Sequence, residues 1–227
     1  MQSLPIRRAG RQAQSGFTLV EIAIVLVIIG LLLGGVLKGQ ELIENGRVKN
    51  AANDMNGLVA AYNSYLDRYR KLPGDDGPNL AALTARGGSW ATITAFGSNN
   101  GILEINAAQT FNGGGEGAAF FQHLRAAGFI TGNPADAGAN ALPVNAWGGR
   151  LGVINDVNIQ GRPAARLLTC LGSVPGKAAA ALDVQLDDGQ PNNGTLRATQ
   201  GANNAAPGAA AAAYNEAQSY TICRDLG

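Results

Sequence analysis

The sequence predicts an α+β protein in which one long N-terminal helix packs on an antiparallel β-sheet. Three observations predict it: an apolar run early in the chain, apolar residues that then continue at helical spacing, and later short strand-like runs bounded by Gly, Pro and Asn. The composition of the whole chain is an average over these different regions. Of the 227 residues, 46% are hydrophobic and 15% are charged, and the formal net charge is +1. Such values exclude a disordered acidic chain and a strongly basic nucleic-acid binder.

The run from Phe17 to Leu37 is long enough to be a membrane-spanning helix. At about 1.5 Å per residue it extends roughly 31 Å, and the hydrocarbon core of a bilayer is about 30 Å thick. Arg7, Arg8 and Arg11 precede the run, and no acidic residue accompanies them. The positive-inside tendency therefore places the N-terminus in the cytoplasm and the chain after Lys38 on the other side of the membrane.

A secretory signal peptide has a similar outline, since it also combines a basic start with an apolar stretch. It needs small residues at a cleavage site after the apolar core, whereas this run continues directly into Lys38, Gly39, Gln40 and Glu41. The suitable small residue, Gly16, precedes the run instead. The order of these residues therefore favours a helix that is retained.

Glu21 is the one charged residue of the apolar run. A carboxylate inside a bilayer is costly and usually marks a partner or a pathway. Cleavage after Gly16 would create an α-amine on Phe17, one helical turn away from Glu21 and of opposite charge. Alternatively, Glu21 favours the positive end of the helix dipole and reaches the cytoplasmic interface. These residues alone leave both interpretations open.

The stretch Gly16-Phe17-Thr18-Leu19-Val20-Glu21 resembles the processing signal of type IV prepilins and pseudopilins. In that family a prepilin peptidase cuts after the glycine and methylates the new amine. The resemblance therefore implies a leader peptide at residues 1–16, a cleavage site between Gly16 and Phe17, and N-methylation of Phe17. It also implies that Glu21 pairs with the amine of an adjacent subunit, which would relieve an otherwise costly buried charge.

Helix character continues past the membrane segment, because apolar residues from Val48 to Tyr69 recur on one face. We expect a transmembrane and polymerisation half at residues 17–37, an amphipathic half at 38–71 and a globular head at 72–227. The whole helix would be about 80 Å long. Three tyrosines of the apolar face are interpreted as core residues: Tyr62, Tyr65 and Tyr69.

Glycines lower the helix propensity of the first half. They are Gly30, Gly34, Gly35, Gly39 and Gly46. Family members often melt part of this helix in the filament, and many have a proline at the position corresponding to Lys38. This chain has Lys38 in place of that proline, so the glycines are the only sequence feature here that would favour melting. The alternative role of the glycines is small-residue packing between helices, for which Gly30 and Gly34 have the spacing.

The head begins at Leu72-Pro73-Gly74-Asp75-Asp76, because Pro73 cannot continue the helix and Gly74 supplies a turn. Short helices are expected from Glu116 to Ala127 and from Lys177 to Leu186, and an exposed low-complexity loop from Gly201 to Ala213. The predicted strands are the following runs: Trp90 to Phe96, Arg150 to Ile154, Ala165 to Cys170, Thr195 to Ala198 and Ser219 to Cys223.

The phrase Leu72-Pro73-Gly74-Asp75 resembles one found in a subgroup of proteobacterial pilin-like proteins. Three further segments resemble that subgroup, at residues 115–128, 145–150 and 186–189. The resemblance therefore runs nearly end to end, and it implies a type IV pilin-like fold with short helices beside the sheet.

Cys170 and Cys223 would form one disulfide in an oxidising compartment. Such a bridge would stabilise the fold by about 4 kcal/mol on a loop-entropy basis, and it would hold the C-terminus in place. In many pilins a bridge of this kind delimits a surface region. By that resemblance, Lys177 to Asn215 is expected to be the exposed, variable face.

No catalytic residue, metal site or cofactor is expected. His123 is the only histidine, and no nucleophile, metal set or phosphate loop accompanies it, so we assign it a surface or capping role. Carboxylates and amides cluster beside glycines at residues 75–76, 155–158 and 187–193, where turns are the preferred interpretation. A calcium ion in a head loop is the alternative, because related pseudopilins bind one there.

The sequence thus predicts a structural subunit of a type IV pilus or pilus-like filament, with no enzymatic activity. The implied partners are copies of itself or other pilins, a prepilin peptidase and an inner-membrane assembly platform. The chain would be a single-pass inner-membrane protein before assembly and part of an extracellular pilus or periplasmic filament afterwards.

Two alternative functions are a pseudopilin of a type II secretion system and a minor pilin whose head binds DNA or a surface, for example in adhesion. DNA binding would need a basic stripe, and nucleic-acid binding is disfavoured because the basic residues are interspersed with acids. The candidates for such a stripe are Arg150, Arg162, Arg166, Lys177 and Arg197.

Overall fold

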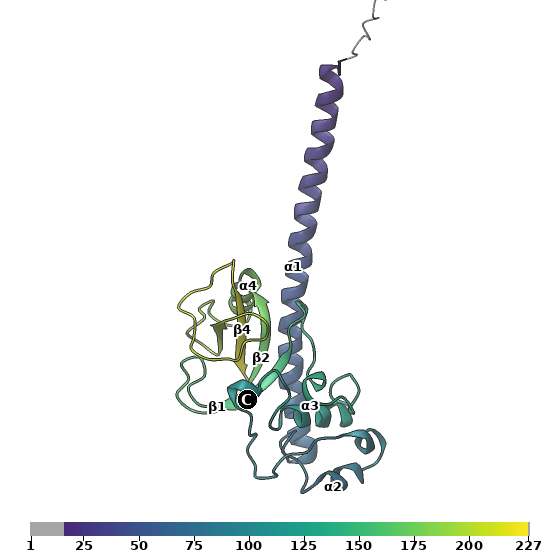
Figure 1. The fold of residues 1–227 in the computed structure, drawn as a ribbon, viewed down its shortest axis with the longest axis vertical. Helices are drawn as coiled ribbons and strands as arrows, with labels where there is room; N and C mark the ends of the chain where they lie inside the picture. Colours follow the sequence, from purple (N-terminus) through teal and green to yellow (C-terminus); the bar gives the residue numbers. More distant parts are fainter. Residues whose placement is uncertain (1–15, 227) are drawn as a thin grey trace, which may run out of the picture. The chain divides into compact units, whose positions relative to one another are not determined.

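The computed structural model describes residues 16–226 and has an α+β fold (Figure 1). Apart from Gly16, the leader expected at residues 1–16, with its three arginines, lies outside the described residues. A single helix, α1 (Leu19–Tyr69), opens the fold. The chain forms two compact units, one that ends at Ile43 and one that begins at Glu44.

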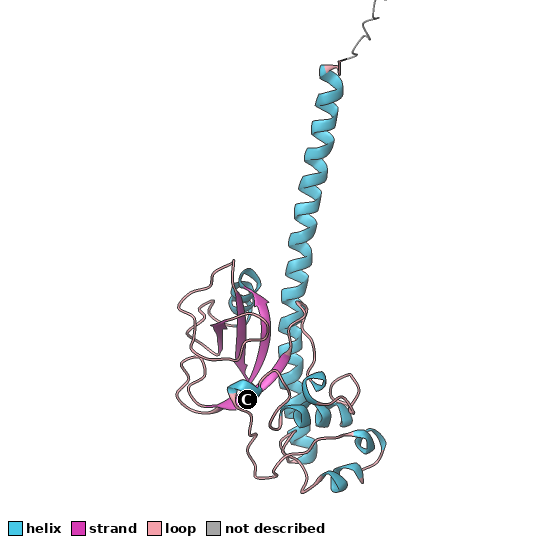
Figure 2. Cartoon of the chain, in the orientation of Figure 1, coloured by secondary structure: helices cyan, strands magenta, loops and turns pink. Residues whose placement is uncertain are grey.

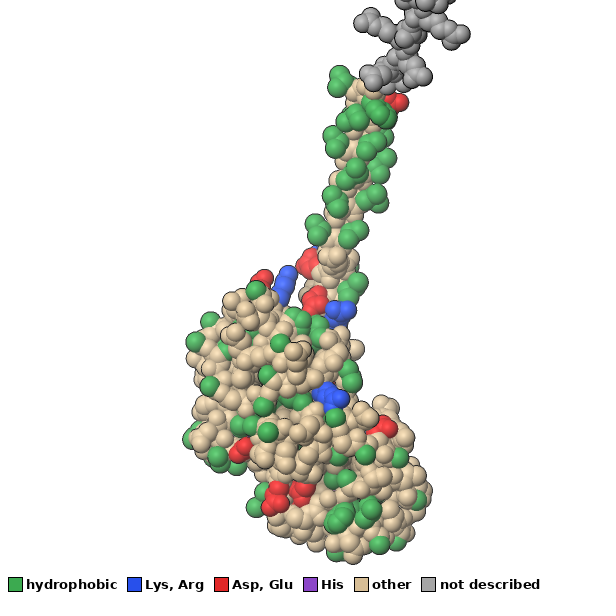
Figure 3. All heavy atoms as spheres, viewed as in Figure 1, with side chains coloured by type: hydrophobic (Ala, Val, Ile, Leu, Met, Phe, Trp, Pro, Cys, Tyr) green, Lys and Arg blue, Asp and Glu red, His purple; other side chains and the backbone are tan. Residues whose placement is uncertain are grey.

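The described part of the N-terminal unit is helical, and from Ile22 to Leu37 it is apolar on every side. Large apolar side chains from Leu19 to Ile43 are exposed around it, as Figure 3 shows. An 18-residue window of α1 has a mean hydropathy of 2.8 and no buried residue. A helix that is hydrophobic all round is typical of a membrane span, so this segment is long and apolar enough to cross a bilayer.

From Glu44 onward, α1 buries one face in the core of the second unit. The buried residues recur every three or four positions: Val48, Ala51, Ala52, Met55, Leu58, Ala61 and Tyr65. They belong to one hydrophobic cluster with Leu171, Val174 and Ile222 of the sheet. The predicted amphipathic helix is therefore confirmed. It ends at Tyr69, shortly before the expected boundary, because Arg70 takes a φ of 54°.

Four antiparallel strands form the sheet of the second unit, in the order β1-β2-β4-β3 (Figure 2). Their bounds are β1 Leu151–Asp156, β2 Arg166–Pro175, β3 Leu196–Gln200 and β4 Ser219–Asp225. Four of the five predicted strands are thus confirmed. Because side chains alternate along a strand, the face turned away from α1 carries a second, smaller apolar cluster. This cluster contains Phe111, Ile154, Ile159, Leu168, Cys170 and Cys223.

The remaining elements are short helices around the sheet. They are α2 (Leu80–Thr84), η1 (Gly88–Thr92), η2 (Ala107–Gln109), α3 (Gly117–Ala126), η3 (Gly138–Ala141) and α4 (Gly176–Leu186). The helices α3 and α4 confirm the two short helices predicted from the sequence. Residues 201–213 are irregular, as expected of a low-complexity loop.

The strand predicted from Trp90 to Phe96 is wrong. Gly87 and Gly88 take φ angles of 72° and 57°, which starts the 3₁₀ turn η1 instead of an extended strand. The following amides find a side-chain acceptor in place of a neighbouring strand, because Thr94 N and Ala95 N both donate to Gln122 Oε1 at 2.9 Å. The backbone is therefore satisfied without joining the sheet.

The expectation that Lys177 to Asn215 forms one exposed face is also wrong. Helix α4 buries Ala178, Ala179 and Leu182 completely or almost completely in the main core. Only its outer side chains remain exposed, among them Lys177 and Val184. The segment therefore contributes to the core as well as to the surface.

Candidate assembly site

The residues of the predicted processing junction lie at the start of α1. Gly16, Phe17 and Thr18 precede the helix, and Glu21 lies in its first turn. The side chain of Phe17 is 84% exposed, and a Cβ atom added to Gly16 would meet nothing within 4 Å. The peptide bond between these two residues is therefore not covered by any other described part of the N-terminal unit.

Glu21 forms a reciprocal cap with Thr18. The backbone N and the Oγ1 of Thr18 both donate to Glu21 Oε2 at 2.8 Å. In return, Glu21 N donates to Thr18 Oγ1 at 3.2 Å. This is a capping box, which satisfies two backbone N–H groups that a helix start would otherwise leave without partners. The helix-start interpretation of Glu21 is therefore realised in the single chain.

Sequence reasoning missed the part that Thr18 plays, although the signal was present. The spacing Thr18-x-x-Glu21 before an apolar run is the pattern of a capping box. Both hydrogen bonds to the carboxylate go to Oε2, and among the described residues Oε1 accepts none. Glu21 can thus accept a further donor through Oε1 while its cap stays intact.

The Leu72–Asp76 turn is held by carboxylates that hydrogen-bond within the protein. Asp75 is buried, and it accepts hydrogen bonds from Gly101 N at 2.6 Å and from Asn100 N at 3.1 Å. Gly74 takes a φ of 96°, as the predicted turn requires. Asp75 therefore joins the end of α1 to the loop at residues 98–101, which agrees with the preferred interpretation as a turn.

Asp76 is the centre of a buried polar network. It accepts a hydrogen bond from Tyr65 Oη at 2.6 Å and two from Arg86, at 2.7 and 3.0 Å. The Arg86 guanidinium also lies over the Trp90 ring, 4.6 Å from its centroid. Burial alone would raise the pKa of Asp76, but the bonds from Arg86 and Tyr65 outweigh it and hold that pKa below its usual value. The network is structural, because its members satisfy one another.

His123 does not lie on the surface, so that part of its predicted role is wrong. Its ring is fully buried, Nδ1 accepts a hydrogen bond from Gly74 N at 2.9 Å, and Nε2 lies 3.3 Å from Ala95 O. Burial lowers the pKa of His123 to about 4, so the ring is neutral at ordinary pH. His123 therefore connects α3 to the turn that follows α1.

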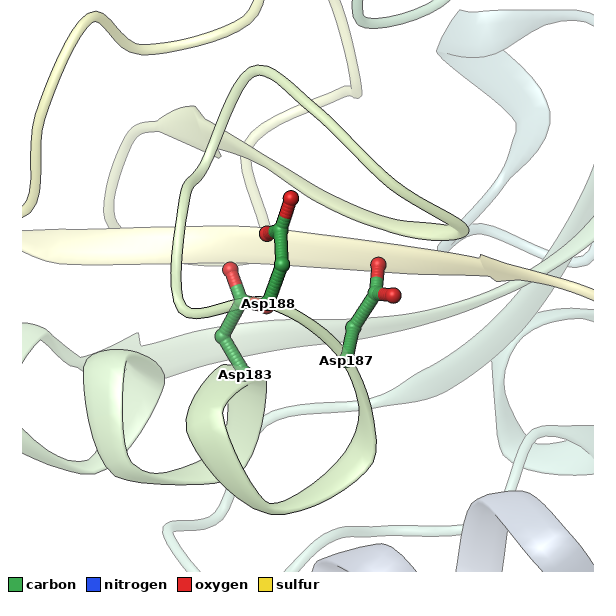
Figure 4. A group of neighbouring side chains, drawn as sticks. All are labelled: Asp183, Asp187 and Asp188. Atoms are coloured by element: carbon green, nitrogen blue, oxygen red, sulfur yellow. The ribbon is translucent and has the colours of Figure 1, made fainter.

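Three aspartates at the C-terminal end of α4 lie close together, as Figure 4 shows: Asp183 in the helix, and Asp187 and Asp188 directly after it. Oxygen atoms of Asp183, Asp187 and Asp188 lie within 4.8 Å of one another. Asp183 accepts hydrogen bonds from Tyr214 Oη at 2.6 Å and from Gly189 N at 3.1 Å. Burial and the nearby carboxylates raise the pKa of Asp183. Each aspartate accepts a bond that holds the turn, and none of these contacts identifies a metal.

The two cysteines are joined in a disulfide between neighbouring strands. Cys170 of β2 stands directly opposite Cys223 of β4 in the sheet register, and both are fully buried. Arg162 adds a second connection, because its buried guanidinium lies 3.3 Å from Asp225. The last strand of the sheet is therefore held by a covalent and an ionic contact.

The basic residues proposed for a DNA-binding stripe are mostly engaged within the protein. Arg162 and Arg166 form ion pairs with Asp225, Arg150 donates to Phe111 O, and Arg197 donates to Gln160 O. These contacts do not favour the DNA-binding alternative.

Comparison with known proteins identifies the N-terminal segment. The prokaryotic N-terminal methylation motif matches residues 11–37, a range that contains Gly16, Phe17 and Glu21. No curated protein and no solved structure matches the chain. The finer resemblance to the subgroup with Leu72-Pro73-Gly74-Asp75 stays a prediction. Residues 11–37 thus carry the N-terminal motif of prepilins and pseudopilins, and the long apolar N-terminal helix, the antiparallel sheet and the short helices fit a type IV pilin-like α+β fold.

Proposed function

We propose that this chain is a structural subunit of a type IV pilus or pilus-like filament, assembled through its N-terminal helix. The observation that carries the proposal is the methylation motif on a helix that is apolar on all sides. Such a surface is costly in water, and both a bilayer and a bundle of identical helices cover it. The protein's contribution is packing and charge pairing, and we assign it no catalytic step.

In this proposal a prepilin peptidase cuts between Gly16 and Phe17 and methylates the amine of Phe17. The exposure of this junction is compatible with access by a peptidase. The chain is anchored in the inner membrane with its N-terminus in the cytoplasm until the assembly platform extracts it. The filament then consists of copies of the chain, alone or with other pilins.

Glu21 receives the amine of a neighbouring subunit in the assembled filament. Its Oε2 atom is engaged with Thr18, and its Oε1 atom accepts no bond from the described residues. A cationic amine brought to Oε1 would neutralise the carboxylate inside the apolar bundle. The pairing therefore favours the position of neighbouring subunits along the filament axis at which the Glu21 carboxylate lies next to the amine of Phe17.

Glu21→Ala tests the pairing, with Thr18→Ala as the matched control. Both substitutions remove the capping box, but only Glu21→Ala removes the carboxylate. We expect both variants to be cleaved and Glu21→Ala to lower the yield of sheared filaments about tenfold or more, while Thr18→Ala has a smaller effect. If the two variants lowered the filament yield equally, the pairing would be contradicted and Glu21 would act only as a helix-capping residue.

Gly16→Leu tests the cleavage junction. A bulky side chain at this position should leave the leader attached, and N-terminal mass spectrometry of the membrane fraction would detect it. Detection of a mature chain that starts with methylated Phe17 in this variant would show that the junction is assigned wrongly.

Electron microscopy of sheared surface material, with mass spectrometry of the filaments, distinguishes a surface pilus from a periplasmic pseudopilus. Surface fibres that contain this chain at its native expression level support the pilus. A chain that is retained in the periplasm, and whose loss blocks secretion, supports the pseudopilin of a secretion system.

A further inference from the structure

An open groove lies on the surface of the second unit between α1 and the segment that leads into β1. It has a volume of about 400 Å³. Asn53, Asp54, Gly57 and Leu58 of α1 form one side. The opposite side is mainly apolar and consists of Phe129, Ile130, Thr131, Pro143, Val144, Asn145 and Leu151. Val144 is 65% exposed, so the rim presents an apolar side chain directly to solvent.

Gly57 has no structural reason within the single chain. It lies inside α1, where glycine is one of the poorest helix formers. A Cβ atom added at this position would meet nothing within 4 Å, so the fold leaves room for alanine or a larger residue. A glycine at this open position of α1 leaves room for another surface to approach the helix backbone closely.

Asp54 places a negative charge beside the apolar rim. Among the described residues it has no hydrogen bond and no ion pair, although it lines the groove one turn before Gly57. Partial burial raises the pKa of this carboxyl. A cation brought into the groove would compensate the carboxylate, so the groove fits a basic and apolar partner surface.

The outer face of α4 has this chemistry. Lys177, Ala181 and Val184 are exposed and are spaced so that they share one side of the helix. Val184 is 70% exposed, and Lys177 has no ion pair within the described residues. The inner face of α4 packs on β2, β3 and β4, and no residue of α4 lines the groove.

We propose that α4 of one copy of this chain docks in the groove of a second copy. Lys177 then pairs with Asp54, and Val184 packs against Val144 and Ile130 beside Gly57. The groove borders β1 and α4 packs on the other three strands, so the two surfaces are different parts of the same unit. Such a contact is heterologous, and repeating it produces an open helical array rather than a closed dimer.

This inference rests on the proposed filament function and assigns a contact between the globular parts of neighbouring subunits. Cysteine cross-linking in the full chain tests it. We expect Val144→Cys combined with Val184→Cys to give a ladder of oligomers on non-reducing gels after mild oxidation of filaments. Two single-cysteine variants expressed together should give a dimer and no ladder. Val157→Cys combined with Val184→Cys is the matched control, because Val157 is also exposed, at 52%, but lies outside the groove.

Charge exchange tests the specific pair. Asp54→Lys and Lys177→Asp should each lower the cross-linked fraction about fivefold, and the double variant should restore most of it. Lys49→Asp, at an exposed lysine of α1 that does not line the groove, should leave the cross-linked fraction unchanged. Gly57→Leu improves helix propensity and occupies the groove, so it should keep the fold and abolish the ladder.

The outcomes separate this contact from the proposed function. Filaments that form without the ladder, or with an equal ladder from the Val157 control, overturn the docking of α4 and leave the filament function intact. A ladder in membranes that contain no filament supports the contact and overturns the filament function. Absence of both the ladder and filaments overturns both proposals.

Discussion

Replacing Tyr65 with Phe isolates one buried hydrogen bond of the second unit. Tyr65 is fully buried and its hydroxyl donates to Asp76 at 2.6 Å, whereas Asp76 keeps both bonds from Arg86 in the variant. Phe occupies the same ring volume, so no large cavity opens. A hydrogen bond to a charged group contributes about 1.5–3 kcal/mol, so Tyr65→Phe should lower the free energy of unfolding by that amount.

The assay is thermal unfolding of the full chain in detergent, followed by near-ultraviolet circular dichroism with the disulfide intact. For a unit of this size, 1 kcal/mol corresponds to roughly 2–4 °C in Tm, so the expected decrease is about 3–12 °C. Tyr62→Phe is the control, because Tyr62 lies on the same helix and its hydroxyl has no hydrogen bond among the described residues. Equal Tm values for the two variants would refute the assigned contribution of the network.

The difference in Tm between wild type and Tyr65→Phe should depend on pH in a defined direction. The pKa of Asp76 is lower in the folded protein than its ordinary value of about 3.9, so the charged network stabilises the fold above that value. This stability is lost as the pH falls through the lower folded pKa, when Asp76 takes up a proton. The difference in Tm between wild type and Tyr65→Phe should therefore narrow below about pH 4. A difference that stays constant down to pH 2 would contradict the charged acceptor.

Three further predictions concern the disulfide, His123 and the aspartate cluster. Replacing Cys170 and Cys223 together with Ala should lower the free energy of unfolding by about 4 kcal/mol, measured by urea denaturation, and a variant as stable as wild type would contradict a role in constraining the chain. The pKa of His123 is about 4 in the folded protein and about 6.5 in the unfolded chain, so the free energy of unfolding should fall as the pH decreases from 6.5 to 4. An imidazole NMR signal that titrates near pH 6.5 in the folded protein would contradict the burial of His123. The pKa of Asp183 is raised in the folded protein, so wild type should lose stability as the pH rises above about 3.9, and Asp183→Asn should flatten this dependence. The Tm of wild type in calcium should equal its Tm in chelator. A calcium-dependent Tm in wild type that Asp183→Asn removes would instead establish a metal site.

The long helix and most of the sheet could be predicted from the sequence because their signals are local. The spacing of Val48, Met55 and Tyr65 defines a helical face without reference to any other segment. The strands β1 to β4 are short apolar runs between turn residues, which is also a local pattern. The N-terminal methylation motif at residues 11–37 could be predicted for the same reason, since it is contiguous in the sequence.

The errors arose where a distant residue decides the local structure. Residues 93–96 resemble a strand, but the amides of Thr94 and Ala95 donate to Gln122, which lies 28 positions after Thr94. The burial of His123 likewise depends on Gly74 and on the rings packed around it, which no local pattern encodes. The role of Thr18 does not depend on a distant residue, because the Thr18-x-x-Glu21 spacing is a local capping-box pattern that the sequence already contains.

The place of β4 has a consequence for when the protein can fold. This strand is the last element in the chain, yet it lies inside the sheet, between β2 and β3, and carries Cys223. Among the described residues β3 pairs only with β4, so neither β3 nor the disulfide can be completed until residues 219–225 have been synthesised. Closure of the sheet is therefore a late event in folding, because a chain without residues 219–225 lacks both the strand that lies between β2 and β3 and the cysteine that pairs with Cys170.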